Sequence, residues 1–159
     1  MRSDNQGTAA LGRRHVAEAI RSRGAEITPI RVGQLVLLEM RNPATCQLIH
    51  LRVKTRNSGT WQGSIGDGDP APQTTHPEVY WVFVDLSGST ERPDYYIVPD
   101  GWMRRDIHRA HQEYLSRHRG MRAETEAATH HAIQAERVAS WRNRWDQLGL
   151  RDGVSKRVG

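Results

Sequence analysis

Several features are scarce in this chain of 159 residues. It has one cysteine, Cys46, which excludes an internal disulfide and favours a reducing compartment. No N-terminal apolar run resembles a signal peptide, and no stretch approaches the roughly 20 apolar residues that span a bilayer. The 36% hydrophobic content suffices for one core. The sequence therefore predicts a single-domain, soluble, cytoplasmic protein with no membrane contact.

Lysine is also scarce, because only Lys54 and Lys156 stand among 23 basic residues and the rest are arginine. The formal net charge is +5 and the pI is about 10.0. Arginine suits bidentate contact with phosphate, so the charge favours a nucleic-acid partner, with DNA expected first. A genome rich in G and C also replaces lysine by arginine, and the two explanations stay open.

One of the two lysines lies in a segment with the alternation of a β-strand, residues 48–55. One face carries His50, Arg52 and Lys54, and the other carries Ile49, Leu51 and Val53. A lysine in this setting offers a compact charge and an amine whose pKa the surroundings can change. The alternative is a solvated cation at the end of a strand.

Apolar periodicity and turn residues predict a helix, then strands, then helices. The first helix is expected over residues 9–23, ending at Gly24. Strands are expected over residues 26–30, 35–40, 48–55, 60–65, 79–86 and 95–98, with an exposed loop over 66–77. Helices are expected over residues 100–118 and 124–147, and the second of these places Trp141 and Trp145 in the core. This order predicts an α/β domain with a central mixed sheet flanked by helices.

Three segments resemble the PD-(D/E)XK nuclease superfamily, in particular its small bacterial members. They are the Val53-Lys54-Thr55 ending followed by Ser58-Gly59-Thr60-Trp61-Gln62, the run Tyr80-Trp81-Val82-Phe83-Val84-Asp85-Leu86, and Pro93-Asp94-Tyr95-Tyr96-Ile97-Val98-Pro99. The resemblance implies a nuclease-like core over residues 7–118 and a helical C-terminal extension over 119–150 packed on it. Residues 1–6 and 151–159 are expected to be flexible tails.

In that superfamily carboxylates hold Mg²⁺, and a lysine activates water or stabilises charge at phosphorus. The resemblance maps the lysine to Lys54 and the carboxylate two residues before it to Arg52. It maps the aspartate of the preceding strand to Val36 and the helical glutamate to Arg13. Valine binds no metal and arginine repels one, so no metal site is expected. Glu39 lies three residues after Val36, and we expect it to point away from the site.

The first functional hypothesis is a nucleic-acid-binding or regulatory protein with an inactive nuclease-like fold and no cofactor. The residues expected to contact nucleic acid are Arg13, Arg14, Arg52, Lys54, Arg56, Trp61 and Gln62. Trp61 stacks a base or fills the core in this interpretation.

Two alternatives remain. The first is an active endonuclease in which Glu18 and Asp85 hold Mg²⁺ and Lys54 acts as the catalytic amine. The second is a protein-interaction subunit of a defence or mobile-element complex, with a protein partner or a second copy of the chain. Zinc sites are not expected, because His108 and His111 lack further ligands nearby in the sequence.

Overall fold

The computed structural model describes residues 2–70, 78–118 and 130–151. In chain order, its elements are α1 (Arg2–Arg21), β1 (Glu26–Val32), β2 (Leu35–Asn42), β3 (Gln47–Arg56), β4 (Trp61–Ser64), the 3-10 helix η1 (Ile65–Asp67), β5 (Val79–Asp85), β6 (Asp94–Pro99), α2 (Asp100–Arg117), β7 (His130–Ile133) and the 3-10 helices η3 (Ala135–Trp141) and η4 (Trp145–Leu148).

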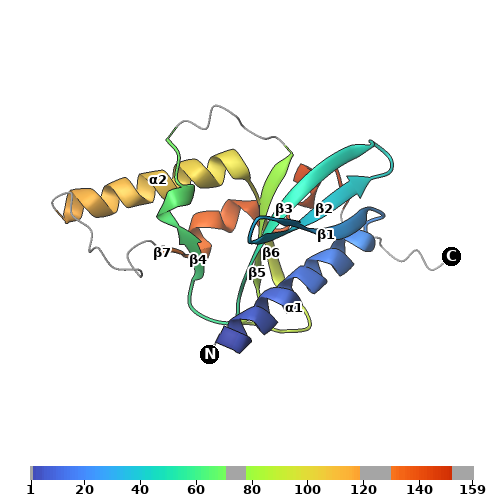
Figure 1. Cartoon of the computed structure of the whole chain (residues 1–159), viewed down its shortest axis with the longest axis horizontal. Helices are drawn as coiled ribbons and strands as arrows, with labels where there is room; N and C mark the ends of the chain where they lie inside the picture. Colours follow the sequence, from blue (N-terminus) through green and yellow to red (C-terminus); the bar gives the residue numbers. More distant parts are fainter. Residues whose placement is uncertain (1, 71–77, 119–129, 152–159) are drawn as a thin grey trace.

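A five-stranded sheet with the order β1-β2-β3-β5-β6 organises the fold (Figure 1). Among the pairs that these five strands form, β3 and β5 are parallel and the others are antiparallel, and Lys54 lies beside Phe83 and Arg56 beside Asp85. The strands β4 and β7 form a second, two-stranded sheet in which Gln62 pairs with Ala132. The sequence-based prediction of an α/β domain with a mixed central sheet is confirmed.

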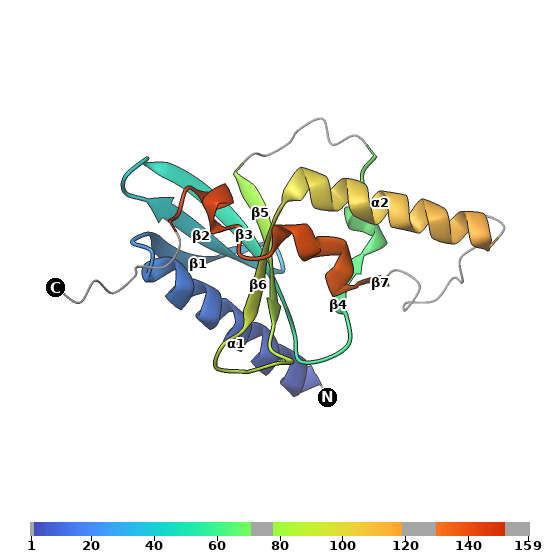
Figure 2. The same ribbon diagram turned by 180° about the vertical axis from the view of Figure 1, so that it is seen from behind.

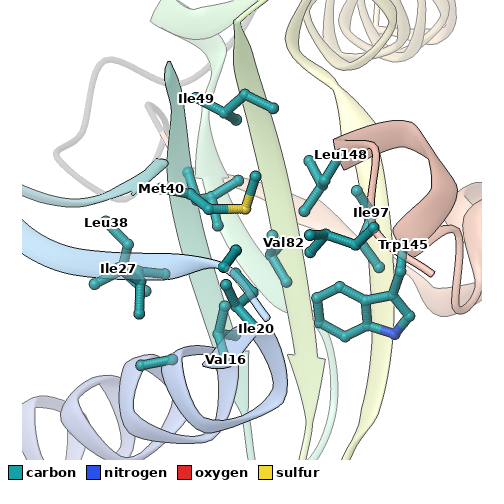
Figure 3. Packing of buried hydrophobic residues seen from close by; sticks show 14 of the residues in the cluster. Val16, Ile20, Ile27, Leu38, Met40, Ile49, Val82, Ile97, Trp145 and Leu148 are labelled. Carbon is teal, nitrogen blue, oxygen red and sulfur yellow. The ribbon is translucent and has the colours of Figure 1, made fainter. Parts of the chain in front are cut away.

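The alternating side chains of the central sheet divide the core into two layers. Figure 3 shows the layer under α1, where Val16 and Ile20 of the helix meet apolar residues of β1, β2, β3, β5 and β6. Trp145 and Leu148 of η4 close the same layer. Helix α1 therefore covers the face of the sheet on which the strands carry these apolar side chains.

The opposite face of β5 and β6 is covered by α2, β4 and the segment around η3 (Figure 2). This second layer is rich in aromatic residues, and Trp61 lies 5.1 Å from Phe83 between ring centroids. The indole nitrogen of Trp61 donates to the carbonyl of Val84 at 2.9 Å, which satisfies its one polar atom. Trp61 is 1% exposed and fills the core, so of its two expected roles the structure supports packing.

The predicted strands are confirmed with small shifts at their ends, and so is the helix now assigned as α2. The helix expected over residues 9–23 is also confirmed as α1, although it begins earlier, at Arg2, and ends at Arg21. The last helix prediction is wrong. The single α-helix expected over residues 124–147 is absent from its described part, which holds β7 and two 3-10 helices instead. The pairing of β7 with β4, far away in sequence, overrides the helical periodicity there.

Parts of several predictions lie outside the described residues: residue 1 of the N-terminal tail, residues 71–77 of the expected loop, residues 119–129 of the expected C-terminal extension with the start of that helix, and the tail over 152–159. Trp145 is 1% exposed and belongs to the core as expected, whereas Trp141 is half-buried against Trp102. Within the described ranges, no helix combines the length and apolar character that crossing a membrane requires.

Candidate functional site

A row of basic side chains follows β3 on the face opposite α1, as the alternation predicts. Arg52 and Arg56 lie over tryptophan rings, with guanidinium carbons 4.1 Å from the Trp81 centroid and 4.2 Å from the Trp61 centroid. Such cation–π contacts hold planar guanidinium groups flat on the aromatic layer. The core beneath β3 therefore fixes the positions of these two cations.

Both arginines also bind carboxylates. Arg52 donates to the two carboxylate oxygens of Asp67 at 3.2 and 3.4 Å. Arg56 donates to Asp85 at 2.6 Å and to the carbonyl of Gly59. The side chains of Arg52 and Arg56 are only 12% and 14% exposed, so most of their charge is neutralised within the protein.

Asp85 is held ionised by its neighbours. Burial by itself would raise the pKa of this carboxyl, but hydrogen bonds from Arg56 and Ser87 outweigh burial and lower the pKa to about 2. Both the backbone nitrogen and the hydroxyl of Ser87 donate to Oδ1, at 2.9 and 2.6 Å. Asp85 thus joins the loop after β5 to the end of β3.

Lys54 lies between the two arginines and differs from both. No hydrogen bond or ion pair joins it to another described residue, and its Nζ is 5.9 Å from the Trp81 centroid. Burial lowers the pKa of its amine, the charge of Arg52 lowers it further, and Asp67 partly opposes both effects. Its ammonium is therefore partly desolvated and incompletely compensated.

A pocket of about 370 Å³ opens at the C-terminal end of β3. Its lining is Thr8 of α1, Lys54, Thr55 and Arg56 of β3, and Asn57, Ser58, Thr60 and Gln62 of the following segment. Asn57 donates to the hydroxyl of Thr8 at 2.9 Å, which ties the segment to α1. Neither aspartate nor glutamate is among the described residues that line this pocket.

The chemistry of the lining suits an anion. Lys54 and Arg56 supply positive charge, and the hydroxyl and amide groups can donate further hydrogen bonds to oxygen. Gln62 is exposed and donates to Thr60 at 3.0 Å. Of the residues expected from the sequence to contact nucleic acid, the pocket brings together Lys54, Arg56 and Gln62. Arg52 lies next to them on the same face of β3.

Other expected residues lie elsewhere. Arg13 and Arg14 are on α1, which packs on the opposite face of the sheet, and neither lines the pocket. Glu18 is also on α1, and its charge acts on Tyr95: burial chiefly raises the pKa of that phenol, Arg23 lowers it and Glu18 raises it. The sheet lies between Glu18 and Lys54, so these two residues do not form a common site.

The register of β2 against β3 corrects one expectation. Because Leu38 pairs with Leu51, Val36 lies on the α1 face and Glu39 lies on the face of Lys54. The expectation that Glu39 points away from this face is wrong. Its carboxylate is 2.9 Å from Nε2 of His50 on the adjacent strand. Within the described residues, no cluster of three or more metal-ligating side chains is found.

The sequence does not single out Thr8, Asn57, Ser58 or, most importantly, Asp67, which lies in the loop expected over residues 66–77. Asp67 ends η1, and the guanidinium of Arg104 on α2 donates to the backbone carbonyl oxygen of Asp67 at 3.3 Å, which holds this segment against α2. Asp67 lies 15 residues from Arg52 in the sequence, so neither helix nor strand periodicity indicates their contact.

A comparison with protein-family models gives no match, and neither do searches of the curated proteins and of the solved structures.

Proposed function

We propose that this protein binds nucleic acid by holding a backbone phosphate in the pocket at the end of β3. One observation carries the proposal: a partly buried ammonium, that of Lys54, lines a pocket of hydroxyl and amide groups that contains no described carboxylate. A phosphate oxygen there would compensate the charge of Lys54 and accept hydrogen bonds from the neighbouring side chains.

Two features favour phosphate over a neutral ligand. The chain carries a net charge of +5, which attracts polyanions over a distance. Lys54 is flanked by Arg52 and Arg56, so a bound anion gains from three cations even though two of them already bind carboxylates. The pocket is open at one side to Asn57, Ser58 and Gln62, which are exposed and reachable by a long polymer.

The proposal includes a nuclease-like origin of the fold, with the acidic metal-binding positions lost. The order of an N-terminal helix, three antiparallel strands and a parallel fourth neighbour supports this origin. Arg52 does not, because it takes the place of the carboxylate that the superfamily has two residues before the lysine. Val36 argues against part of the mapping, because it lies on the other face from Lys54. We therefore rest the proposed function on the pocket and not on the resemblance.

The test is a binding titration of fluorescently labelled single-stranded and duplex DNA at several salt concentrations, with Mg²⁺ or Mn²⁺ added in parallel to detect cleavage. The variant Lys54→Ala is compared with Arg31→Ala, which removes an exposed charge of β1 away from the pocket. We expect Lys54→Ala to weaken binding and to reduce the slope of log K against log salt by about one. Arg31→Ala should change both much less.

The outcomes separate the hypotheses. Salt-dependent binding without cleavage, weakened by Lys54→Ala, supports the proposal. Equal binding by the wild type and Lys54→Ala would exclude the pocket as the phosphate site. Cleavage that requires metal and is lost in Lys54→Ala would favour the endonuclease alternative. In that case Asp67 or Asp85 would leave its ion pair with Arg52 or Arg56 to bind the metal. No binding to either DNA would favour a protein partner.

A further inference from the structure

A second pocket, of about 580 Å³, lies between α2 and β7. Its lining is Arg109, Ala110, Glu113, Tyr114, Arg117 and His118 of α2 and the following turn, and His130, His131, Ala132, Gln134 and Arg137 of β7 and the segment after it. None of these residues belongs to the β3 pocket. The second pocket holds aromatic, histidine and arginine side chains together.

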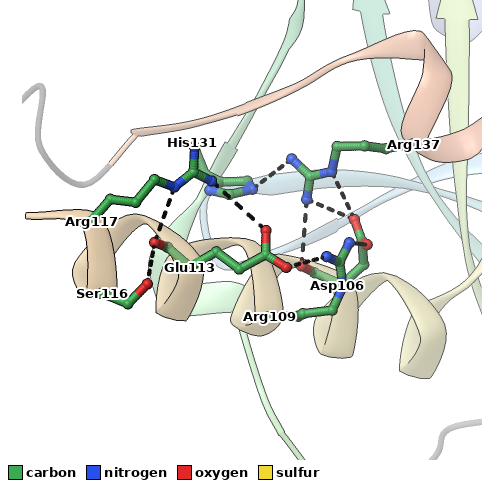
Figure 4. A network of polar contacts seen from close by, with 7 residues as sticks. All are labelled: Asp106, Arg109, Glu113, Ser116, Arg117, His131 and Arg137. Atoms are coloured by element: carbon green, nitrogen blue, oxygen red, sulfur yellow. Dashed lines mark hydrogen bonds and ion pairs between the residues drawn. The ribbon is translucent and has the colours of Figure 1, made fainter.

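A network of ion pairs joins several of the lining residues to Asp106 of α2 (Figure 4). Arg137 donates twice to the buried carboxylate of Asp106, at 2.6 and 2.9 Å, and also to Nε2 of His131 at 2.9 Å. Arg109 bridges Asp106 and Glu113, with both distances at 2.7 Å. These contacts use both carboxylates and fix the walls of the pocket.

Arg117 is the arginine of this group that the network engages least. Its nearest carboxylate atom, on Glu113, is 3.9 Å away, and its side chain is 73% exposed. Three arginines thus face two carboxylates, so the pocket keeps an excess of positive charge at its outer end. Beside Arg117, the rings of Tyr114 and His118 stack at 4.0 Å between centroids. An arginine beside an exposed aromatic pair suits a phosphate and its base.

The two-stranded sheet connects the two pockets. Gln62 of β4 lines the β3 pocket and Ala132 of β7 lines the second one, and these two residues are direct partners in the antiparallel register. Both are exposed, whereas their neighbours Trp61 and Ile133 point into the core. Partners in such a pair lie about 5 Å apart between Cα atoms, so the two pockets border on each other at this pair.

We infer that the two pockets form one continuous path for a single-stranded nucleic acid, which runs from Lys54 across the exposed face of β4 and β7 to Arg117 and the Tyr114–His118 pair. This inference rests on the proposed function and adds the class of nucleic acid and the second contact site. A single strand can place a phosphate in one pocket and turn a base toward the other. A duplex keeps its bases stacked inside and its phosphates on a stiff cylinder.

The test uses anisotropy titrations of labelled oligothymidines of increasing length, from about 3 to about 12 nucleotides, with duplexes of the same lengths. The variants are Arg117→Ala and Tyr114→Ala in the second pocket, Lys54→Ala in the first, and Arg31→Ala as the control outside both. Arg117 and Tyr114 are exposed, so their removal should leave folding intact, which circular dichroism checks.

We expect affinity of the wild type to rise with length until the strand fills both pockets. Arg117→Ala and Tyr114→Ala should each lower the affinity for the long oligonucleotides by about fivefold or more and leave the affinity for the shortest ones unchanged. Lys54→Ala should lower the affinity for oligonucleotides of every length. Tighter binding of the single strand than of the duplex is the second expected result.

Two results would overturn the inference while the proposed function stands. In the first, Arg117→Ala and Tyr114→Ala leave the dependence of affinity on oligonucleotide length unchanged, while Lys54→Ala lowers the affinity at every length. The other is a preference for duplex over single strand at equal length. If the wild type binds no oligonucleotide of any length, both the inference and the proposed function are wrong.

Discussion

A Cβ atom placed on Gly12 would lie 1.7 Å from the hydroxyl oxygen of Thr55 and 2.8 Å from two of its carbons. The glycine lets α1 approach β3 directly where the β3 pocket begins, since Thr55 and the neighbouring Lys54 both line it. The distance between helix and strand at this point therefore decides the shape of the proposed phosphate site.

The first prediction concerns this approach. Gly12→Ala should destabilise the protein by about 1–3 kcal/mol, because the added methyl group forces α1 away from β3. Gly7→Ala is the control on the same helix, where a Cβ meets nothing within 4 Å, and it should stabilise by up to about 1 kcal/mol. Urea denaturation measures both. Equal effects of the two substitutions would contradict the close packing of Gly12 on Thr55.

The second prediction concerns Asp67, which binds Arg52 and whose charge partly compensates Lys54. Asp67→Asn should tighten DNA binding several-fold and steepen its salt dependence by about one unit of slope, because Arg52 becomes available to phosphate. Asp146→Asn, which breaks an exposed pair with Arg144, is the matched control for net charge. The same gain in both variants would show that net charge alone, and not the Arg52 contact, governs binding.

The third prediction concerns acid stability. The folded protein lowers the pKa of Asp85 from 3.8 to about 2, so its contribution is complete above pH 4 and is lost as the pH falls toward 2. Asp85→Asn should cost about 2 kcal/mol of unfolding free energy at pH 7 and flatten the decline of stability between about pH 4 and 2. Denaturation at a series of pH values measures this. Asp94→Asn removes the carboxylate of an exposed ion pair and should cost well under 1 kcal/mol.

The fourth prediction concerns Trp145, which packs at 5.2 Å from Tyr95 and under the guanidinium of Arg23 at 4.4 Å. Trp145→Ala should cost about 3–5 kcal/mol, since it empties a core position that is 1% exposed. Trp141→Ala should cost less, because Trp141 is only half-buried. A loss below about 1 kcal/mol for Trp145→Ala would instead assign that ring to an interface.

The local pattern of the sequence determined most of the central sheet. Alternation along residues 48–55 placed His50, Arg52 and Lys54 on one face, and the structure agrees because the period of a strand fixes the side of every second residue. The apolar run over residues 79–86 likewise predicted a strand, and the two sides of β5 face the two core layers.

Only the tertiary structure decided what surrounds that row of charges. The register of β2 against β3 depends on how the two strands pair. It places Glu39 on the same face of the sheet as Lys54 and Val36 on the opposite face. Asp67 reaches Arg52 through a chain reversal, and β7 pairs with β4 in place of a helix, because contacts between distant segments outweigh local preference. The sequence determined which charges β3 carries, and packing determined which of them remain uncompensated, since that depends on carboxylates brought from elsewhere in the chain.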